Sequence, residues 1–252
     1  MTEIASAINT AMNSGYSIAE PHVISVYFAP AGTDWYDGSG ASPAVGWNDY
    51  QITQVFSALE QWSNVANVQF VQTDSRDDAD FQLGITQLSP GLNGLFFLPD
   101  GSENAGIGSF TSHTNYMATE AGGALDAGGI GYDLLLHETG HGLGLLHPYP
   151  DDGNTTAFPG VSSPDDLGLY NLNQGIYTVM TSNPGWVTGP DGVSPTGDYG
   201  YAFTPMPLDI AVIQSIYGAN TTYENGNTNY YLPDQNASGT GYQSIFDTGG
   251  NF

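Results

Sequence analysis

The chain has 252 residues, of which 26 are Asp or Glu and only one, Arg76, is a Lys or Arg, so its formal net charge at pH 7 is −25. A protein this acidic repels nucleic acids and anionic membranes, and we expect neither as a partner. The absence of cysteine excludes disulfide bonds, and no apolar run reaches the length of about 18 residues that spans a membrane.

We interpret the acidity mainly as a well-solvated surface, although a negative field would also favour cationic substrates at low salt. The first 20 residues lack a basic segment followed by a long apolar core, so we expect no secretory signal peptide there. The length predicts one domain, 1–252, with a substantial core.

The first half of the chain predicts strands and one long helix. Residues 22–29 alternate apolar and polar side chains like a strand, and residues 30–47, rich in Gly, Asp, Pro and Ser, predict a loop. Residues 48–66 place apolar side chains at helical spacing and predict an amphipathic helix. Further strands are predicted at about 68–72, 80–85, 94–99 and 107–113.

The segment HETGHGLGLLHP, residues 137–148, holds three of the five histidines. On a helix, His137 and His141 share one face because they are four residues apart. Gly144 can end the helix in a left-handed turn, Pro148 prevents its continuation, and His147 can then return to the first two. Three neutral histidines and a water molecule make a catalytic zinc site, whereas structural zinc sites are closed by four protein ligands.

Glu138, next to the first histidine, is not needed to bind the metal. Its expected role is that of the general base that takes a proton from the zinc-bound water. The alternative is a helix whose histidines only cap or pack, and the number of spaced positions in the motif argues against it.

The motif resembles the signature of the metzincin metallopeptidases, and Pro148 directly after it resembles the serralysin branch. Downstream, YTVM followed by TSNPGW (177–186) resembles the family's Met-turn, and PMPLDIAVIQSIYGAN (205–220) its following helix. Upstream, ALEQWSNVANVQFVQ (58–72) and ADFQLGI (79–85) resemble its first long helix and the strands after it. The resemblance covers roughly residues 22–252.

This resemblance implies an α+β metzincin fold, in which a twisted mixed β-sheet with an antiparallel edge strand packs on two long helices. A smaller C-terminal lobe is expected at about 145–220, after an N-terminal lobe at about 20–144. The tail, 221–252, resembles the start of a β-roll, but the sequence contains no G-G-x-G-x-D repeat.

The resemblance also implies roles for residues around the motif. Met180 is expected as an apolar floor beneath the zinc ligands. The edge strand is expected to bind the substrate backbone by β-augmentation, and residues 149–175 to form a wall of the primed-side pocket. His22 and His113 have no partner at ligand spacing and are expected to be ordinary strand or loop residues. The expected substrate-binding residues of the edge strand are Leu95, Phe96, Phe97 and Leu98.

Two positions depart from the family pattern. Ser182 stands where serralysins usually carry a tyrosine that can bind the resting zinc and stabilise the oxyanion; Tyr177 and Asn183 are the candidates to substitute for it. The segments 224–228 and 246–250 resemble those that enclose a calcium ion, but Phe252 occupies the position of a second aspartate, and two ordinary surface turns are the alternative. The implied calcium ligands are Glu224, Gly226, Thr228, Asp247 and Gly249.

The sequence therefore predicts a zinc-dependent endopeptidase, monomeric and secreted by family resemblance, that hydrolyses internal peptide bonds of polypeptides. The alternative is a catalytically silent metzincin-like domain that binds peptides or a protein partner, and Ser182 is the feature that favours it. A metal-dependent hydrolase of a non-peptide amide has no supporting residue.

Overall fold

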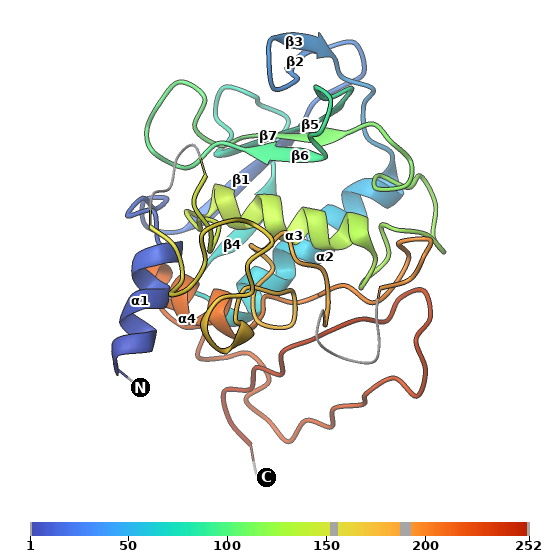
Figure 1. The fold of residues 1–252 in the computed structure, drawn as a ribbon. Coiled ribbons are helices and arrows are strands. Elements are labelled where there is room, and N and C mark those ends of the chain that lie inside the picture. Colours follow the sequence, from blue (N-terminus) through green and yellow to red (C-terminus); the bar gives the residue numbers. More distant parts are fainter. Residues whose placement is uncertain (1, 152–155, 187–192, 251–252) are drawn as a thin grey trace.

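The computed structural model describes residues 2–151, 156–186 and 193–250 (Figure 1). Its elements, in chain order, are α1 (Thr2–Met12), β1 (Val23–Phe28), β2 (Asp34–Tyr36), β3 (Ala41–Pro43), α2 (Asp49–Val65), β4 (Gln69–Gln72), β5 (Phe81–Thr86), β6 (Gly94–Phe96), β7 (Ile107–Thr111), α3 (Ile130–Gly142), the 3₁₀ turn η1 (Leu169–Asn171) and α4 (Pro207–Tyr217).

Five of the strands form one mixed sheet in the order β4-β1-β5-β7-β6. The strands β4, β1, β5 and β7 run parallel, while β6 pairs antiparallel with β7 at the edge. The α+β class, the mixed sheet and its antiparallel edge strand are therefore confirmed. The strand β6 is shorter than the predicted 94–99, although Phe97 N still donates to Ile107 O (3.0 Å).

The helices α2 and α3 lie side by side beneath this sheet (Figure 1). The helix α2 begins where the sequence places it, because Asn48 and Gln51 form a reciprocal capping box. Trp62 on α2 is fully buried, and its Nε1 donates to Thr139 Oγ1 of α3 (3.1 Å). With 17 residues α2 is long, whereas α3 has 13, which is ordinary for a globular protein; the expected pair of long helices is not confirmed.

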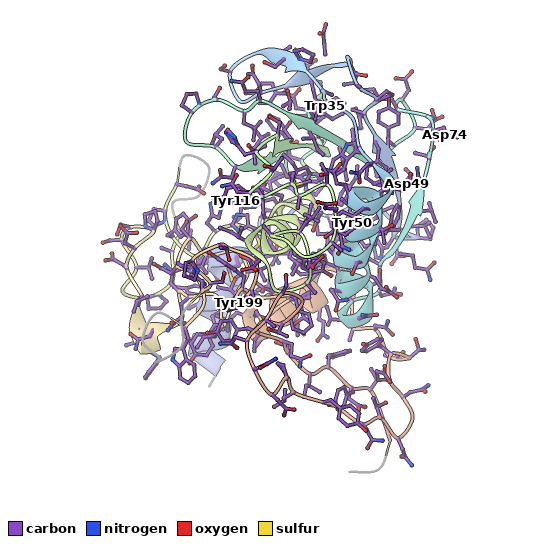
Figure 2. All side chains as sticks on the ribbon, turned by 90° about the vertical axis from the view of Figure 1, so that its right-hand side faces the viewer. Trp35, Asp49, Tyr50, Asp74, Tyr116 and Tyr199 are labelled. Atoms are coloured by element: carbon purple, nitrogen blue, oxygen red, sulfur yellow. The ribbon has the colours of Figure 1, made fainter. Side chains whose placement is uncertain are left out.

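The sequence patterns missed the helix α1 and the hairpin formed by β2 and β3. The prediction of a loop over 30–47 is wrong for β2 and β3, which form an antiparallel hairpin above the main sheet (Figure 1). Trp35 of β2 is buried against Gly84 of β5, and its Nε1 donates to Gly108 O of β7 (3.1 Å; Figure 2). The helix α1 packs near α4 at the opposite end of the molecule (Figure 1).

After α4, the described residues contain no helix or extended strand, and they form a long loop on the side of the molecule away from the sheet (Figure 1). None of the helices in the described ranges is both long and apolar enough to cross a membrane.

Candidate metal centre

The three histidines of the motif converge. His137 and His141 lie on one face of α3, with ring centroids 4.9 Å apart. Nε2 of His147 lies 3.0 Å from Nε2 of His137 and 3.1 Å from Nε2 of His141. The structure thus brings together the three side chains that the spacing singled out.

The turn after α3 carries His147 back to the helix. Gly144 adopts a left-handed conformation (φ 97°), as its position predicts, and a Cβ there would lie 2.5 Å from Tyr16 O. The N-terminal segment holds this turn, since Ser14 N donates to Gly144 O (3.1 Å) and Leu146 N donates to Met12 O (2.8 Å). No sequence pattern predicted this support.

A second group orients each imidazole. His137 Nδ1 donates to Val179 O (2.7 Å), and His141 Nδ1 donates to Leu145 O (2.8 Å). Since a carbonyl oxygen only accepts, Nδ1 carries the proton in both rings and each Nε2 presents a lone pair. His147 Nδ1 contacts the carboxylate of Asp151.

Burial is the main reason why these imidazoles are uncharged. Burial, together with the smaller effect of a neighbouring histidine, lowers the pKa of His137 and His141 to about 3 and that of His147 to about 4. Hydrogen bonds at Nδ1 oppose the shift without cancelling it. Neutral imidazole is the form that binds zinc.

The residues fit a zinc ion. The Nε2 lone pair of His147 faces those of His137 and His141 at 3.0 and 3.1 Å, and such lone pairs repel unless a cation lies between them. Tetrahedral zinc with Zn–N bonds of about 2.0–2.1 Å would place its nitrogens about 3.3 Å apart, close to the observed spacing. The hydrogen-bonded Nδ1 atoms supply the orienting contacts that such ligands require.

Glu138 lies beside the histidines as a buried carboxyl group. Its Oε2 has no hydrogen-bond partner within the described residues, and burial raises its pKa to about 8. The group reaches Gly94 of β6, where a Cβ would collide with it. Glu138 can therefore hold a proton close to the edge strand.

A cavity of about 790 Å³ connects these groups. Its walls are residues 91–96 and 98, one face of α3, the chain after His147 and residues 175, 178, 179 and 181–185, and Tyr116, Tyr201 and Ala202 also line it. From the predicted wall at 149–175, only Tyr149, Asp151 and Gly175 line it among the described residues.

The edge strand contributes to this cavity unevenly. Leu95, Phe96 and Leu98 line it, although the ring of Phe96 also packs on Phe81 (4.8 Å between centroids). The ring of Phe97 packs against Tyr36 (5.3 Å between centroids) and does not line the cavity, and a role of Phe97 in substrate binding stays a prediction.

Met180 is fully buried and packs on α3 between the first two histidines. A Cβ on Gly140 would lie 2.7 Å from its Sδ. Behind it, the buried carboxylate of Asp209 accepts hydrogen bonds from Thr178 Oγ1 (2.6 Å), Val179 N (2.8 Å) and Met206 N (2.8 Å). Asp209 therefore ties α4 to the residue whose carbonyl orients His137, a role that no sequence pattern predicted.

Ser182 is hydrogen-bonded to a tyrosine, but not to one of the expected candidates. Tyr149 OH lies 2.6 Å from Ser182 Oγ, and its ring is stacked on His147 (4.6 Å between centroids). Asn183 is engaged elsewhere, since its Nδ2 donates to Pro164 O and Asn173 O. Tyr177 does not line the cavity. Tyr149 is the residue that sequence reasoning missed.

The two segments of the expected calcium site lie side by side. Gly249 and Gly250 pack so closely on residues 225–227 that neither position has room for a Cβ. Asp247 accepts from Gly249 N (2.9 Å) and Tyr230 OH (2.8 Å), while Glu224 accepts from Thr228 Oγ1 (2.6 Å). Phe252 lies outside the described residues, and calcium binding by Gly226 and the other expected ligands stays a prediction.

The remaining histidines lie outside the metal centre. His22 is buried, with its ring edge-on to Tyr217 (5.0 Å between centroids). His113 begins the turn after β7, where its backbone carbonyl accepts from Tyr116 N and Met117 N. Neither residue lines the cavity.

Comparison with known proteins relates the chain to bacterial metalloproteases. It is 30% identical over 240 residues to metalloprotease AprA of Pseudomonas entomophila, covering 89% of this chain and 47% of that protein. It is 28% identical over 218 residues to serralysin of Photorhabdus luminescens (81% and 42%), and 32% identical over 199 residues to serralysin C of Dickeya chrysanthemi (76% and 38%).

No family model matches the chain. It spans less than half the length of these curated relatives, but they match most of the chain itself. The chain is thus a homologue of the serralysin-type metallopeptidases.

Proposed function

We propose that the chain is a zinc-dependent endopeptidase with a metzincin fold, which hydrolyses internal peptide bonds of polypeptides. One observation carries the proposal: three neutral imidazoles direct their Nε2 lone pairs at a common point beside a buried carboxyl group without a hydrogen-bond partner. His137, His141 and His147 would hold the zinc ion. Similarity to the serralysins supports the reaction class.

Zinc bound there would supply a Lewis acid that polarises a carbonyl group and lowers the pKa of water. Glu138 takes the proton of the attacking water and transfers it to the leaving amine. Its Oε2 is free for this, and its raised pKa favours retention of the proton between the two transfers.

The free edge of β6 supports binding of an extended polypeptide. Asn93 O and Phe97 N bond to β7, so strand alternation directs the backbone groups of Gly94 and Phe96 away from the sheet. A substrate strand added there would run past Glu138, because Gly94 contacts that carboxyl group. Leu95 and Leu98 would contact its side chains.

We propose that Tyr149 supplies the phenol group that is missing at Ser182. Its ring lies against His147, and Ser182 fixes the phenol oxygen at the cavity. A phenol in this position can donate a hydrogen bond to negative charge that develops on the substrate carbonyl.

The remaining expectations form one proposal for the chain as a whole. We place an N-terminal lobe at about 20–144, a C-terminal lobe at about 145–220 and a calcium-stapled tail at 221–252 in a single domain. The protein is proposed to be a secreted monomer. Family resemblance supports these points.

A catalytically silent domain that binds peptides is the second candidate, and Ser182 favours it. Glu138 argues against it, since a binding module needs no buried base beside the histidines. The hydrogen bond between Tyr149 and Ser182 weakens the argument from Ser182, because Tyr149 can supply a phenol group there.

Casein turnover by the zinc-loaded protein, with and without a chelator, tests the proposal. We expect chelator-sensitive cleavage at internal bonds, one bound zinc per chain, and loss of most turnover in Glu138→Gln with its zinc retained. Glu60→Gln, which changes an exposed acid on α2, is the matched control and should stay active. An active Glu138→Gln would exclude the assigned base, and a protein that binds zinc and peptides without cleaving them would support the silent alternative.

A further inference from the structure

Asp133 lies one helical turn before His137, on the same face of α3, and lines the same cavity. Tyr116, Ile130 and Tyr201 also line this cavity, and we call the part lined by these residues and Asp133 the Asp133 end. The mechanism proposed above makes no use of this carboxyl group.

The Asp133 carboxylate receives no hydrogen bond from the part of the chain that the structure describes, in contrast to Asp209, which receives three. Burial and the nearby charge of Asp209 raise its pKa to about 8. Burial, followed by the charge of Asp133 and by Tyr116, raises the pKa of Tyr201 to about 12, which shows that these groups lie close together.

The chain itself cannot supply a cation to this end. Arg76 is its only Lys or Arg, and the guanidinium lies over the Trp35 ring (4.8 Å) while its Nε donates to Gln82 Oε1 (3.0 Å). A half-buried carboxylate without a positive partner favours a ligand that brings one.

The shape and chemistry of this end match a long basic side chain. Ile130 and the two tyrosine residues offer apolar surface for a methylene stem, and Asp133 offers a carboxyl group that a bound cation would ionise. The net charge of −25 adds a field that attracts cationic ligands.

We propose that Asp133 is a specificity-determining residue, through which the cavity selects a lysine or arginine side chain of the polypeptide substrate. This inference rests on the proposed peptidase function and names its substrate class. It differs from an ordinary role for a first-turn acid, which is to interact with the N-terminal end of the helix dipole.

Peptide cleavage provides the first test. Peptides that differ only in lysine, norleucine or glutamine are compared at each position around the bond that the zinc-loaded protein cleaves. At one position we expect kcat/KM for the lysine peptide to exceed that of both others by at least about tenfold. Lysine would form a desolvated, charge-assisted hydrogen bond with Asp133 that norleucine and glutamine cannot form. Asp133→Asn should bring this ratio close to one, and Asp133→Glu should retain part of it.

Asp49→Asn is the matched control. Asp49 is also a first-turn acid, but it is exposed at the start of α2, away from Tyr116 (Figure 2). Asp49→Asn should leave the lysine preference unchanged. If Asp133 acted only through net charge or the helix dipole, the two variants would have the same effect. Equal rates for lysine and norleucine at every position, or a preference that survives Asp133→Asn, overturn the inference.

Binding separates this inference from the peptidase function. Calorimetry of the same peptides on zinc-loaded Glu138→Gln should show the lysine preference, and the double variant with Asp133→Asn should lose it. Lysine-selective binding that depends on Asp133, without cleavage by the unmutated protein, would reject the peptidase function and keep the inference. Cleavage without any lysine preference would reject the inference and keep the peptidase function.

Discussion

The phenol oxygen of Tyr149 lies 2.6 Å from Ser182 Oγ, and the Tyr149 ring is stacked on His147 at an interplanar angle of 12°. Two residues 33 positions apart thus hold a hydroxyl group beside the candidate metal ligands. Ser182 stands where serralysins usually carry a tyrosine, and the tyrosine that contacts Ser182 comes from a different part of the chain.

Tyr149→Phe should lower kcat/KM by roughly tenfold to a thousandfold while zinc content and Tm change little, because the lost hydrogen bond acts on charge that develops in the transition state. Peptide turnover and metal analysis of the purified variant measure both quantities. Tyr177→Phe removes a hydroxyl group that does not line the cavity and serves as the control. Unchanged kcat/KM in Tyr149→Phe would restrict this phenol to packing on His147.

Asp209 permits a prediction about pH. Burial raises its pKa from 3.8 to about 7, against the lowering effect of its hydrogen bonds. The folded state therefore binds more protons than the unfolded state between these two values. Its contribution favours folding at the acidic end of this window and is lost as the pH rises through it.

Asp209→Asn should remove this dependence and keep the fold. Val179 N and Met206 N both donate to Oδ2, so one amide oxygen can accept both, and the amide nitrogen can donate to Thr178 Oγ1. Across the window, the unfolding free energy of the variant should rise relative to the unmutated protein by roughly 2–4 kcal/mol. Urea unfolding of both chelated proteins at a series of pH values measures the difference.

A difference that does not change with pH would show that Asp209 is ionised in the folded protein throughout the window. Asp209→Ala leaves two backbone donors and a hydroxyl group without their acceptor and should destabilise the protein by more than about 2 kcal/mol at any pH. Comparison of the two variants therefore separates the effect of Asp209 protonation on the unfolding free energy from the effect of its hydrogen bonds.

Local patterns predicted the parts of the structure that depend on neighbouring residues. The helix over 48–66 follows from apolar periodicity, and the convergence of His137, His141 and His147 follows from helix geometry with a glycine turn. Helical and strand periods act within a few residues, so sequence alone reveals them.

The parts that could not be predicted depend on contacts between distant segments. The hairpin β2–β3 lies in a stretch with loop composition, and it is held where Trp35 packs on Gly84 and donates to Gly108. Asp209 bonds to a hydroxyl group 31 positions earlier. No local pattern signals such pairs, because tertiary packing overrides propensity in short strands and turns.

Gly144→Ala should disturb the metal centre through the backbone. A Cβ at φ 97° is strained and would lie 2.5 Å from Tyr16 O. We expect a loss of about 2 kcal/mol or more in unfolding free energy and weaker zinc binding, since the turn positions His147. Gly122→Ala is the control, because Gly122 has a similar φ of 94° with nothing within 4 Å of its Cβ position. Equal effects of the two variants would assign the whole cost to backbone strain.

The last prediction concerns the calcium that we expect to staple the tail to the domain. Asp247 belongs to one of two closely packed segments whose glycines leave room for carbonyl oxygens, and calcium prefers six to eight oxygen ligands. If calcium binds only the folded protein, Tm should rise with calcium concentration above the dissociation constant while zinc is held saturating. Asp247→Ala should abolish this increment, and Asp234→Ala, an exposed acid in the same tail, should keep it. Thermal unfolding at a series of calcium concentrations measures the increment, and its absence from the unmutated protein would mean that residues 224–228 and 246–250 form two ordinary surface turns.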